Sequence, residues 1–160
     1  MKTTVLILIF MLITAVARGD QFRLGVPDES AFFHSIAKVE SKSAWAAVGD
    51  RHLKYRAHGA YQIRYPAITD VNRVYRKAVL VRWGRLLTPA DMHDPEMARW
   101  TLRAYLHHYG DVYERRTGRK PDAKVYSRIH NGGPNGWRDR NTLAYWRKVS
   151  VYLAGVRTYG

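Results

Sequence analysis

Apolar side chains recur every three or four positions over much of the chain, which predicts a mainly helical fold. The first such segment follows Ser30, a residue type that caps helices, and should end near Ser41. Its apolar positions are Phe32, Phe33, Ile36 and Ala37. Residues 42–61 keep no sustained period and contain turn-forming glycines, so we expect a loop or a small, irregular hairpin there.

Caps and helix stops divide the rest of the chain. Pro66 suits the first turn of a helix that ends before Gly84. Asp94 can cap a helix that stops at Gly110, and a shorter helical turn is expected at 112–116. The last two helices should begin at Asp122 and Asn141. The pattern predicts one mainly α (α+β) domain with an irregular insertion after its first long helix.

The first 17 residues have the organisation of a signal peptide. Lys2 supplies a positive charge, an apolar run follows, and the small residues Ala15 and Ala17 suit a cleavage site. The run is shorter than the roughly 20 apolar residues that a spanning helix needs. We therefore expect a secreted protein, extracellular or periplasmic, whose mature part is a single domain at 18–160.

The composition is strongly basic, with 27 Lys and Arg against 13 Asp and Glu and a formal charge of +14. Such a charge favours association with anionic cell-wall polymers and, electrostatically, with membrane surfaces. No motif for specific nucleic-acid recognition is present. A hydrophobic content of 46% argues against a disordered basic tail, and a folded monomer is expected.

The chain has no cysteine, which excludes a disulfide scaffold, a thiol nucleophile and a cysteine-ligated zinc site. Histidine offers no metal site either. His107 and His108 are adjacent and point to different sides of a helix, and no His-Glu-x-x-His pattern occurs. We expect neither a metal nor another cofactor, so oxygen and nitrogen groups must perform any chemistry.

Glu40 lies in an unusual position for a solvated glutamate. Phe33, Ile36 and Ala37 precede it by seven, four and three residues, which places it on the apolar face of its own helix. Partial burial and the negative end of the helix dipole both favour a protonated carboxyl, as a general acid requires. The alternative is a glutamate at the edge of the core that pairs with an arginine.

Asp50 follows ten residues later in the loop-like stretch, between Gly49 and the basic residues Arg51 and His52. Solvent and nearby positive charge should keep it ionised. Two carboxyl groups in such different environments are the arrangement that glycoside hydrolysis uses: one protonates the leaving oxygen, and the other attacks, activates water or stabilises the oxocarbenium-like centre. Without Glu40 as a partner, Asp50 would be an ordinary turn aspartate.

Two clusters beside glycines resemble the lining of a sugar-binding groove. The first contains Tyr61 and Gln62, and the second contains His130, Asn131 and Gly132. Planar amides suit hydroxyl groups, and aromatic faces suit the apolar sides of sugars. The second cluster would serve equally well as a plain helix stop.

Together these motifs resemble the invertebrate-type lysozymes from about residue 36 to 149. The resemblance is carried by Val39-Glu40-Ser41, Val48-Gly49-Asp50, Gly59-Ala60-Tyr61-Gln62-Ile63, the run from Tyr126 through His130-Asn131-Gly132-Gly133-Pro134-Asn135-Gly136, and Thr142-Leu143-Ala144-Tyr145-Trp146. It implies a lysozyme-like fold that cleaves bacterial peptidoglycan between N-acetylmuramic acid and N-acetylglucosamine. Glu40 would be the acid, Asp50 the second carboxylate, and Ser41 would join the two clusters in binding substrate. Unlike that disulfide-rich family, this chain lacks cysteine.

Two other functions fit the same residues. Soluble lytic transglycosylases share a Glu-Ser pair followed by Gly-x-x-Gln-Ile, need one glutamate and form an anhydro product without water. A non-catalytic cationic protein could instead coat walls or membranes and disrupt cells by charge alone, although the basic residues form short groups rather than one block.

Overall fold

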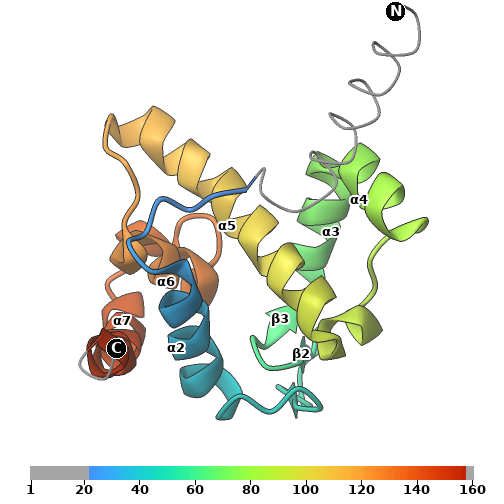
Figure 1. Cartoon of the computed structure of the whole chain (residues 1–160), viewed down its shortest axis with the longest axis horizontal. Helices are drawn as coiled ribbons and strands as arrows, with labels where there is room; N and C mark the ends of the chain where they lie inside the picture. The colour runs from blue at the N-terminus through green and yellow to red at the C-terminus, as the bar shows by residue number, and fades with distance from the viewer. Residues whose placement is uncertain (1–21, 158–160) are drawn as a thin grey trace, which may run out of the picture.

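The computed structural model describes residues 22–157 and is mainly helical, with one small antiparallel sheet, as predicted (Figure 1). The predicted leader at 1–17 lies outside the described residues. The elements are α2 (Glu29–Ser41), β1 (Val48–Gly49), β2 (Ala57–His58), β3 (Ile63–Arg64), α3 (Tyr65–Val74), α4 (Arg76–Trp83), the 3-10 helix η1 (Pro89–His93), α5 (Pro95–Thr117), α6 (Ala123–Gly132), the 3-10 helix η2 (Gly136–Arg138) and α7 (Thr142–Arg157).

Helix α2 supplies one wall of the molecule. Its cap is Asp28, whose carboxylate accepts from the Ala31 amide at 2.8 Å, so the cap lies two residues before the predicted Ser30. The helix ends where Lys42 adopts a left-handed conformation with φ of 56°. Its buried face includes Phe32, Phe33 and Ile36, and Glu40 follows in the last turn.

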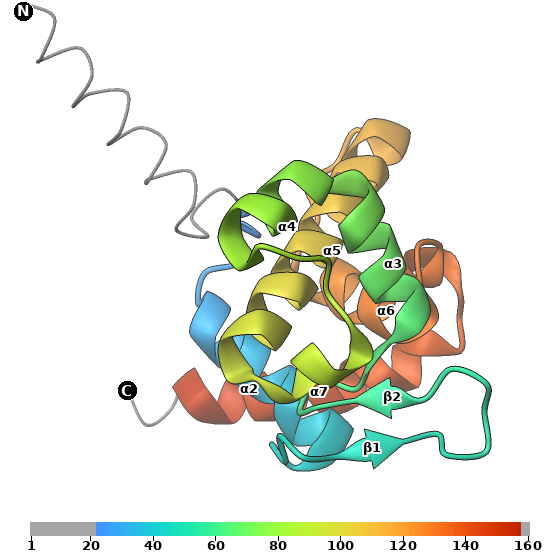
Figure 2. The same cartoon turned by 90° about the vertical axis from the view of Figure 1, so that its right-hand side faces the viewer.

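The stretch after α2 forms the predicted hairpin. Strands β1, β2 and β3 pair antiparallel in sequence order, with Val48 opposite His58 and Ala57 opposite Arg64. Figure 2 shows that the loop joining β1 to β2 extends away from the helices at the edge of the molecule. The sheet therefore presents one face toward the helices and carries an exposed loop at its tip.

Two helix predictions were wrong. The expected single helix after Pro66 is two helices, α3 and α4, that meet at Tyr75, where φ is −112° and ψ is 28°. Val71 and Val79, on either side of this junction, are both buried, so the spacing of apolar residues does not reveal the break.

Helix α5 continues through Gly110 to Thr117, and Gly118 forms its actual end with φ of 69°. A Cβ at Gly110 would lie 2.7 Å from the Tyr126 ring carbon Cε1. This glycine therefore permits close packing of α5 against α6 instead of stopping the helix, and the short helix predicted at 112–116 is part of α5.

Helix α5 packs against α3, α6 and η1, and α7 lies against both α2 and α6. Figures 1 and 2 show the hairpin at the open end of this arrangement, next to α2 and the start of α3. Helix α6 begins after Asp122, as predicted; Asp122 caps it by accepting from the Val125 amide at 2.8 Å, and the helix ends at Gly132. None of the described helices combines the length and apolar character required to cross a membrane.

Candidate active site

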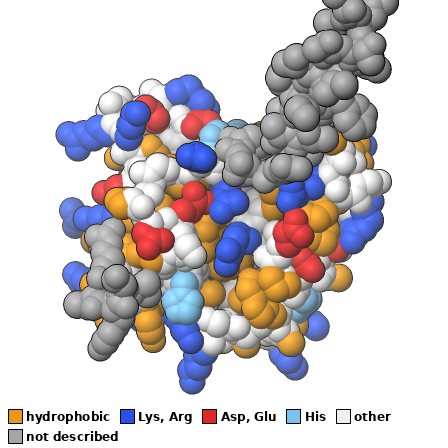
Figure 3. Space-filling model, in the orientation of Figure 1, with side chains coloured by type: hydrophobic (Ala, Val, Ile, Leu, Met, Phe, Trp, Pro, Cys, Tyr) orange, Lys and Arg blue, Asp and Glu red, His pale blue; other side chains and the backbone are white. Residues whose placement is uncertain are grey.

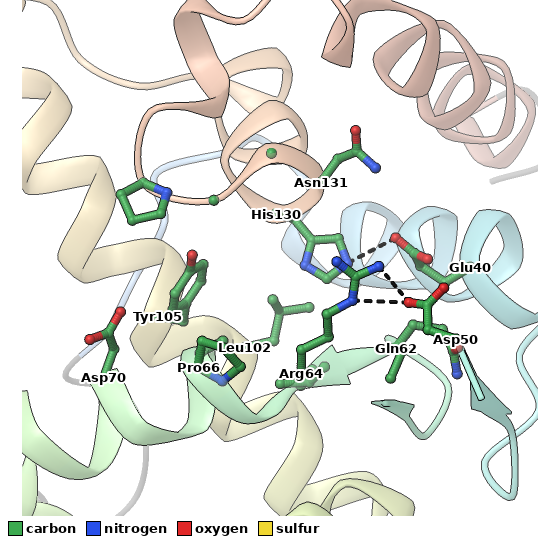
Figure 4. A pocket seen from close by; sticks show the side chains of 16 residues that line it. Glu40, Asp50, Gln62, Arg64, Pro66, Asp70, Leu102, Tyr105, His130 and Asn131 are labelled. Carbon is green, nitrogen blue, oxygen red and sulfur yellow. Dashed lines mark hydrogen bonds and ion pairs between the residues drawn. The ribbon is translucent and has the colours of Figure 1, made fainter. Parts of the chain in front are cut away.

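A cavity of about 600 Å³ lies between the hairpin and the helices (Figure 4). Six of the eight predicted site residues line it: Glu40, Asp50, Gln62, His130, Asn131 and Gly132. They come from α2, the hairpin and α6, which are far apart in the sequence. The remaining lining residues are Ala57, Ile63, Arg64, Pro66, Ala67, Asp70, Leu102, Tyr105, Gly133 and Pro134.

Glu40 is partly withdrawn from solvent, with 19% of its side chain exposed. His130, from the last turn of α6, places Nε2 at 3.1 Å from Glu40 Oε1, and its own side chain is 7% exposed. When His130 carries its proton on Nε2, this contact restrains the Oε1 atom of the Glu40 carboxyl group. Figure 4 shows both side chains at the same end of the cavity.

Tyr145 of α7 lies behind this pair. Its ring centroid is 6.0 Å from that of His130, and its residue exposure is 8%. Burial first, and the adjacent Glu40 carboxylate second, raise the pKa of the Tyr145 hydroxyl well above its usual value. Glu40 lies close enough to act on the hydroxyl through its charge and as a hydrogen-bond acceptor, although the contact falls outside ordinary hydrogen-bond geometry. Tyr145 therefore presents a neutral O–H group to the carboxyl, a contribution that the sequence analysis did not assign.

Asp50 follows β1 with φ of 50°, a conformation that aspartate adopts more readily than most residues. Its Oδ2 accepts from Arg64 Nε at 3.0 Å and also pairs with Nη2 of the same guanidinium. The positive charge near Asp50 was expected from Arg51 and His52, but Arg51 donates to the Val48 carbonyl at 3.4 Å. Arg64 was missed, although it directly follows the Gln62-Ile63 pair of the quoted motif.

Gln62 also has a positive φ, of 50°. Its Nε2 donates to the Gly59 carbonyl at 2.8 Å, and its Oε1 lies above Gly49, where a Cβ would be 2.1 Å away. Only a glycine at 49 leaves room for this amide, so Gln62 is held beside the residue that carries the second carboxylate.

Ser41 and Tyr61, the other two predicted site residues, do not line this cavity. Ser41 Oγ donates to the Ala60 carbonyl at 2.9 Å and so ties the end of α2 to the turn before β3. Tyr61 is 1% exposed, and its ring packs edge-on against Phe33 and Trp45. An aromatic next to Gln62 suits a groove in sequence, but the fold uses this ring in the core.

The far end of the cavity contains two residues that the sequence analysis missed, Asp70 of α3 and Tyr105 of α5. Partial burial alone would raise the pKa of Asp70, but hydrogen bonds from Arg73 and Tyr109 outweigh it and lower the pKa. The Tyr109 hydroxyl donates to Asp70 Oδ2 at 2.5 Å. Helical spacing alone does not indicate that these residues line a cavity, because it places Tyr105 in the core and Asp70 on the surface.

In the part of the chain that the structure describes, no group of three or more His, Asp or Glu side chains is arranged to hold a metal ion. His107 instead contacts the Tyr75 hydroxyl, at 3.4 Å from Nδ1.

Two curated proteins match part of the sequence, whereas no protein-family model matches it. "Lysozyme 1" from Crassostrea virginica is 51% identical over 39 residues, which is 24% of this chain and 21% of that protein. A lysozyme from Magallana gigas is 44% identical over 48 residues, or 30% of this chain and 32% of that protein. The matched segments thus span about a fifth and a third of these relatives.

The fold has a match among solved structures. A chain in the crystal structure of Aeromonas hydrophila PliI in complex with Meretrix lusoria lysozyme aligns with a TM-score of 0.60 and 19% identity, over 76% of this chain and 87% of that chain. This likeness concerns the fold, whereas the oyster proteins carry the likeness in sequence. The chain therefore has a mainly helical, lysozyme-like fold and resembles the invertebrate-type lysozymes.

Proposed function

We propose that this protein is a secreted, bacteriolytic glycosidase that cleaves peptidoglycan between N-acetylmuramic acid and N-acetylglucosamine. The observation that carries the proposal is the meeting of Glu40 and Asp50 at one cavity, the first half-buried against His130 and the second paired with Arg64. The likeness to lysozymes supports the same class of reaction. Bacterial wall polymers are the proposed partner, and a monomer suffices because both carboxyl groups belong to one chain.

Glu40 is the proposed general acid. Protonation of the glycosidic oxygen requires a carboxyl group that faces the substrate and retains its proton until the bond breaks. His130, itself part of the cavity lining, contacts Glu40 Oε1, and the neutral Tyr145 hydroxyl lies next to the same carboxyl, so both restrain its orientation for the bound sugar. We assign both as positioning residues, since neither is required to touch the reacting atoms.

Asp50 is the proposed second carboxylate. Its negative charge lies along the same cavity, where it can stabilise the positive charge that develops on the sugar ring or attack the anomeric carbon. Arg64 holds Oδ2 from one side, which fixes the orientation of the carboxylate and leaves Oδ1 as the oxygen available for this role. Gln62, Asn131 and Gly132 are proposed to contact substrate from the hairpin and α6.

The pairing of Asp50 with Arg64 also favours a second candidate, a lytic transglycosylase. A carboxylate already engaged by a guanidinium is a weaker nucleophile, and a transglycosylase needs only the acid. The two reactions differ in one product: hydrolysis gives a reducing end, whereas transglycosylation gives an anhydro end.

The deciding experiment is mass spectrometry of purified peptidoglycan after digestion by the wild type, Glu40→Gln and Asp50→Asn. We expect reducing-end muropeptides from the wild type. Glu40→Gln should lose activity by a factor of at least about 100, the lower range for general acid catalysis, and Asp50→Asn should be severely impaired. Both changes are nearly isosteric, so thermal unfolding should remain close to that of the wild type.

Each alternative has its own outcome. Anhydro products together with a mild effect of Asp50→Asn would establish the transglycosylase. If Glu40→Gln retains full bacteriolysis while the wild type releases no glycan fragments, the protein kills by charge and the enzymatic proposal is wrong. On the face in Figure 3, Lys and Arg side chains are scattered among acidic and apolar ones, which offers no concentrated patch for such a charge-only action.

A further inference from the structure

A small pocket of about 250 Å³, separate from the active-site cavity, lies at the hairpin and the start of α3. It is lined by Lys54, Tyr55, Arg56, His58, Tyr65 and Pro89, none of which lines the active-site cavity. Ala57 lines the cavity and the next residue of β2, His58, lines this pocket. Because successive strand residues point to opposite faces, the two pockets lie on opposite faces of the small sheet.

Two exposed tyrosines, Tyr55 and Tyr65, line this pocket. The rings of Tyr55 and Tyr65 stack with centroids 5.6 Å apart and an interplanar angle of 17°. They are 42% and 47% exposed, which leaves much of this aromatic surface open to solvent. Stacking orders both rings before any ligand arrives, so binding on them costs little side-chain entropy. We name this pair the tyrosine platform.

Positive charge surrounds the tyrosine platform. Lys54 Nζ lies 5.2 Å from the centre of the Tyr55 ring, and Arg56 lines the same pocket with an exposed side chain. Arg51 and His52 are exposed in the same loop, and none of the six lining residues is acidic. Burial, then His93 and Arg56, lower the pKa of His58, which therefore remains a neutral hydrogen-bonding group at neutral pH.

We propose that the tyrosine platform is a second binding site, for an acidic glycan. A sugar ring would lie on an exposed tyrosine face, and its carboxylate or phosphate would pair with Lys54 and Arg56. The choice of ligand rests on the proposed function, since an enzyme that cuts an insoluble acidic glycan gains from holding it outside the cleft. The compact pocket suits one sugar unit better than a nucleic-acid strand, which needs a groove with successive stacking surfaces.

Binding is best tested in the Glu40→Gln background, where the polymer is held but not cut. Co-sedimentation with purified peptidoglycan should show about tenfold weaker binding for Tyr65→Ala and for the double change Lys54→Gln with Arg56→Gln. Tyr65→Phe, which keeps the stack, should bind normally. The matched control is Tyr152→Ala on α7, since Tyr152 is 46% exposed and lies far along the chain from the platform.

Two further measurements separate the possible sources of the anion and the two proposals. Peptidoglycan stripped of phosphate-bearing polymers should lose the effect only if phosphate is the group bound; retention of the effect identifies the carboxylate. With Glu40 intact, the platform variants should cleave short soluble oligosaccharides at the wild-type rate.

The inference is overturned if Tyr65→Ala binds as tightly as Tyr152→Ala while both remain folded by circular dichroism. It is also overturned if a single-stranded oligonucleotide displaces peptidoglycan more effectively than an acidic oligosaccharide does. If the platform variants bind weakly but the wild type releases no glycan fragments, the proposed catalysis fails and the binding site stands.

Discussion

Gly59→Ala should damage both the fold and the active site. Gly59 lies in the turn between β2 and β3 with φ of 73°, and a Cβ there would lie 1.7 Å from the backbone oxygen of Met92 in η1. Since that oxygen belongs to a backbone rather than to a flexible side chain, the hairpin and η1 must move apart. The same glycine's carbonyl accepts from both the backbone and the side-chain nitrogen of Gln62, so the movement also reaches the cavity.

The magnitude follows from two contributions. A left-handed conformation costs a non-glycine residue roughly 1–2 kcal/mol, and forcing an extra carbon into a packed site costs about 1–3 kcal/mol. The sum, about 2–5 kcal/mol, is a large part of the roughly 5–15 kcal/mol that stabilises a typical protein. Gly84→Ala is the matched control, because its φ is 68° and a Cβ there would meet no atom within 4 Å. Only the first contribution applies to it.

Urea unfolding followed by tryptophan fluorescence measures both variants on the same scale. Alanine lowers the conformational entropy of the unfolded chain in both variants, so this effect cancels in the comparison. We expect Gly59→Ala to be less stable than Gly84→Ala by about 1–3 kcal/mol and to lose activity even under conditions where it remains folded. Equal stability of the two variants would refute the steric argument.

Two further predictions concern ion pairs. Arg64→Gln should lower kcat/KM roughly ten- to hundredfold, because it frees the Asp50 carboxylate to leave its productive orientation, and Arg64→Lys should restore part of the activity. The free energy of unfolding should change by under about 1 kcal/mol, since this pair is exposed. Unchanged kinetics would contradict the role assigned to Arg64. Asp91→Asn should destabilise the fold at pH 7, because hydrogen bonding from Arg85 lowers the pKa of the buried Asp91 carboxyl. That stabilisation is present above the unfolded pKa of about 3.9 and is lost as the pH falls through the lower pKa of the folded state. The difference in free energy of unfolding between variant and wild type should therefore be smaller at pH 3 than at pH 7. A constant difference would show that Asp91 does not act through its charge.

Local patterns were sufficient for the helical class, for the hairpin after α2 and for the placement of Glu40 at the end of a buried helix face. These features depend on residues a few positions apart, where apolar spacing and caps act directly. The lengths of the helices were harder to predict from the sequence. Gly110 looks like a helix stop in sequence, yet it lies inside α5, because contact with Tyr126 on another helix determines its role.

The immediate surroundings of the two carboxyl groups were decided by the tertiary structure. His130 and Tyr145 reach Glu40 from α6 and α7, about 90 and 105 residues along the chain, and Arg64 reaches Asp50 across the sheet. Tyr61 shows the same dependence, since its neighbours Phe33 and Trp45 place in the core an aromatic that the motif made a candidate for the groove. A residue's own neighbours in sequence set its backbone conformation, but the partner that neutralises, orients or buries its side chain comes from segments that only folding brings together.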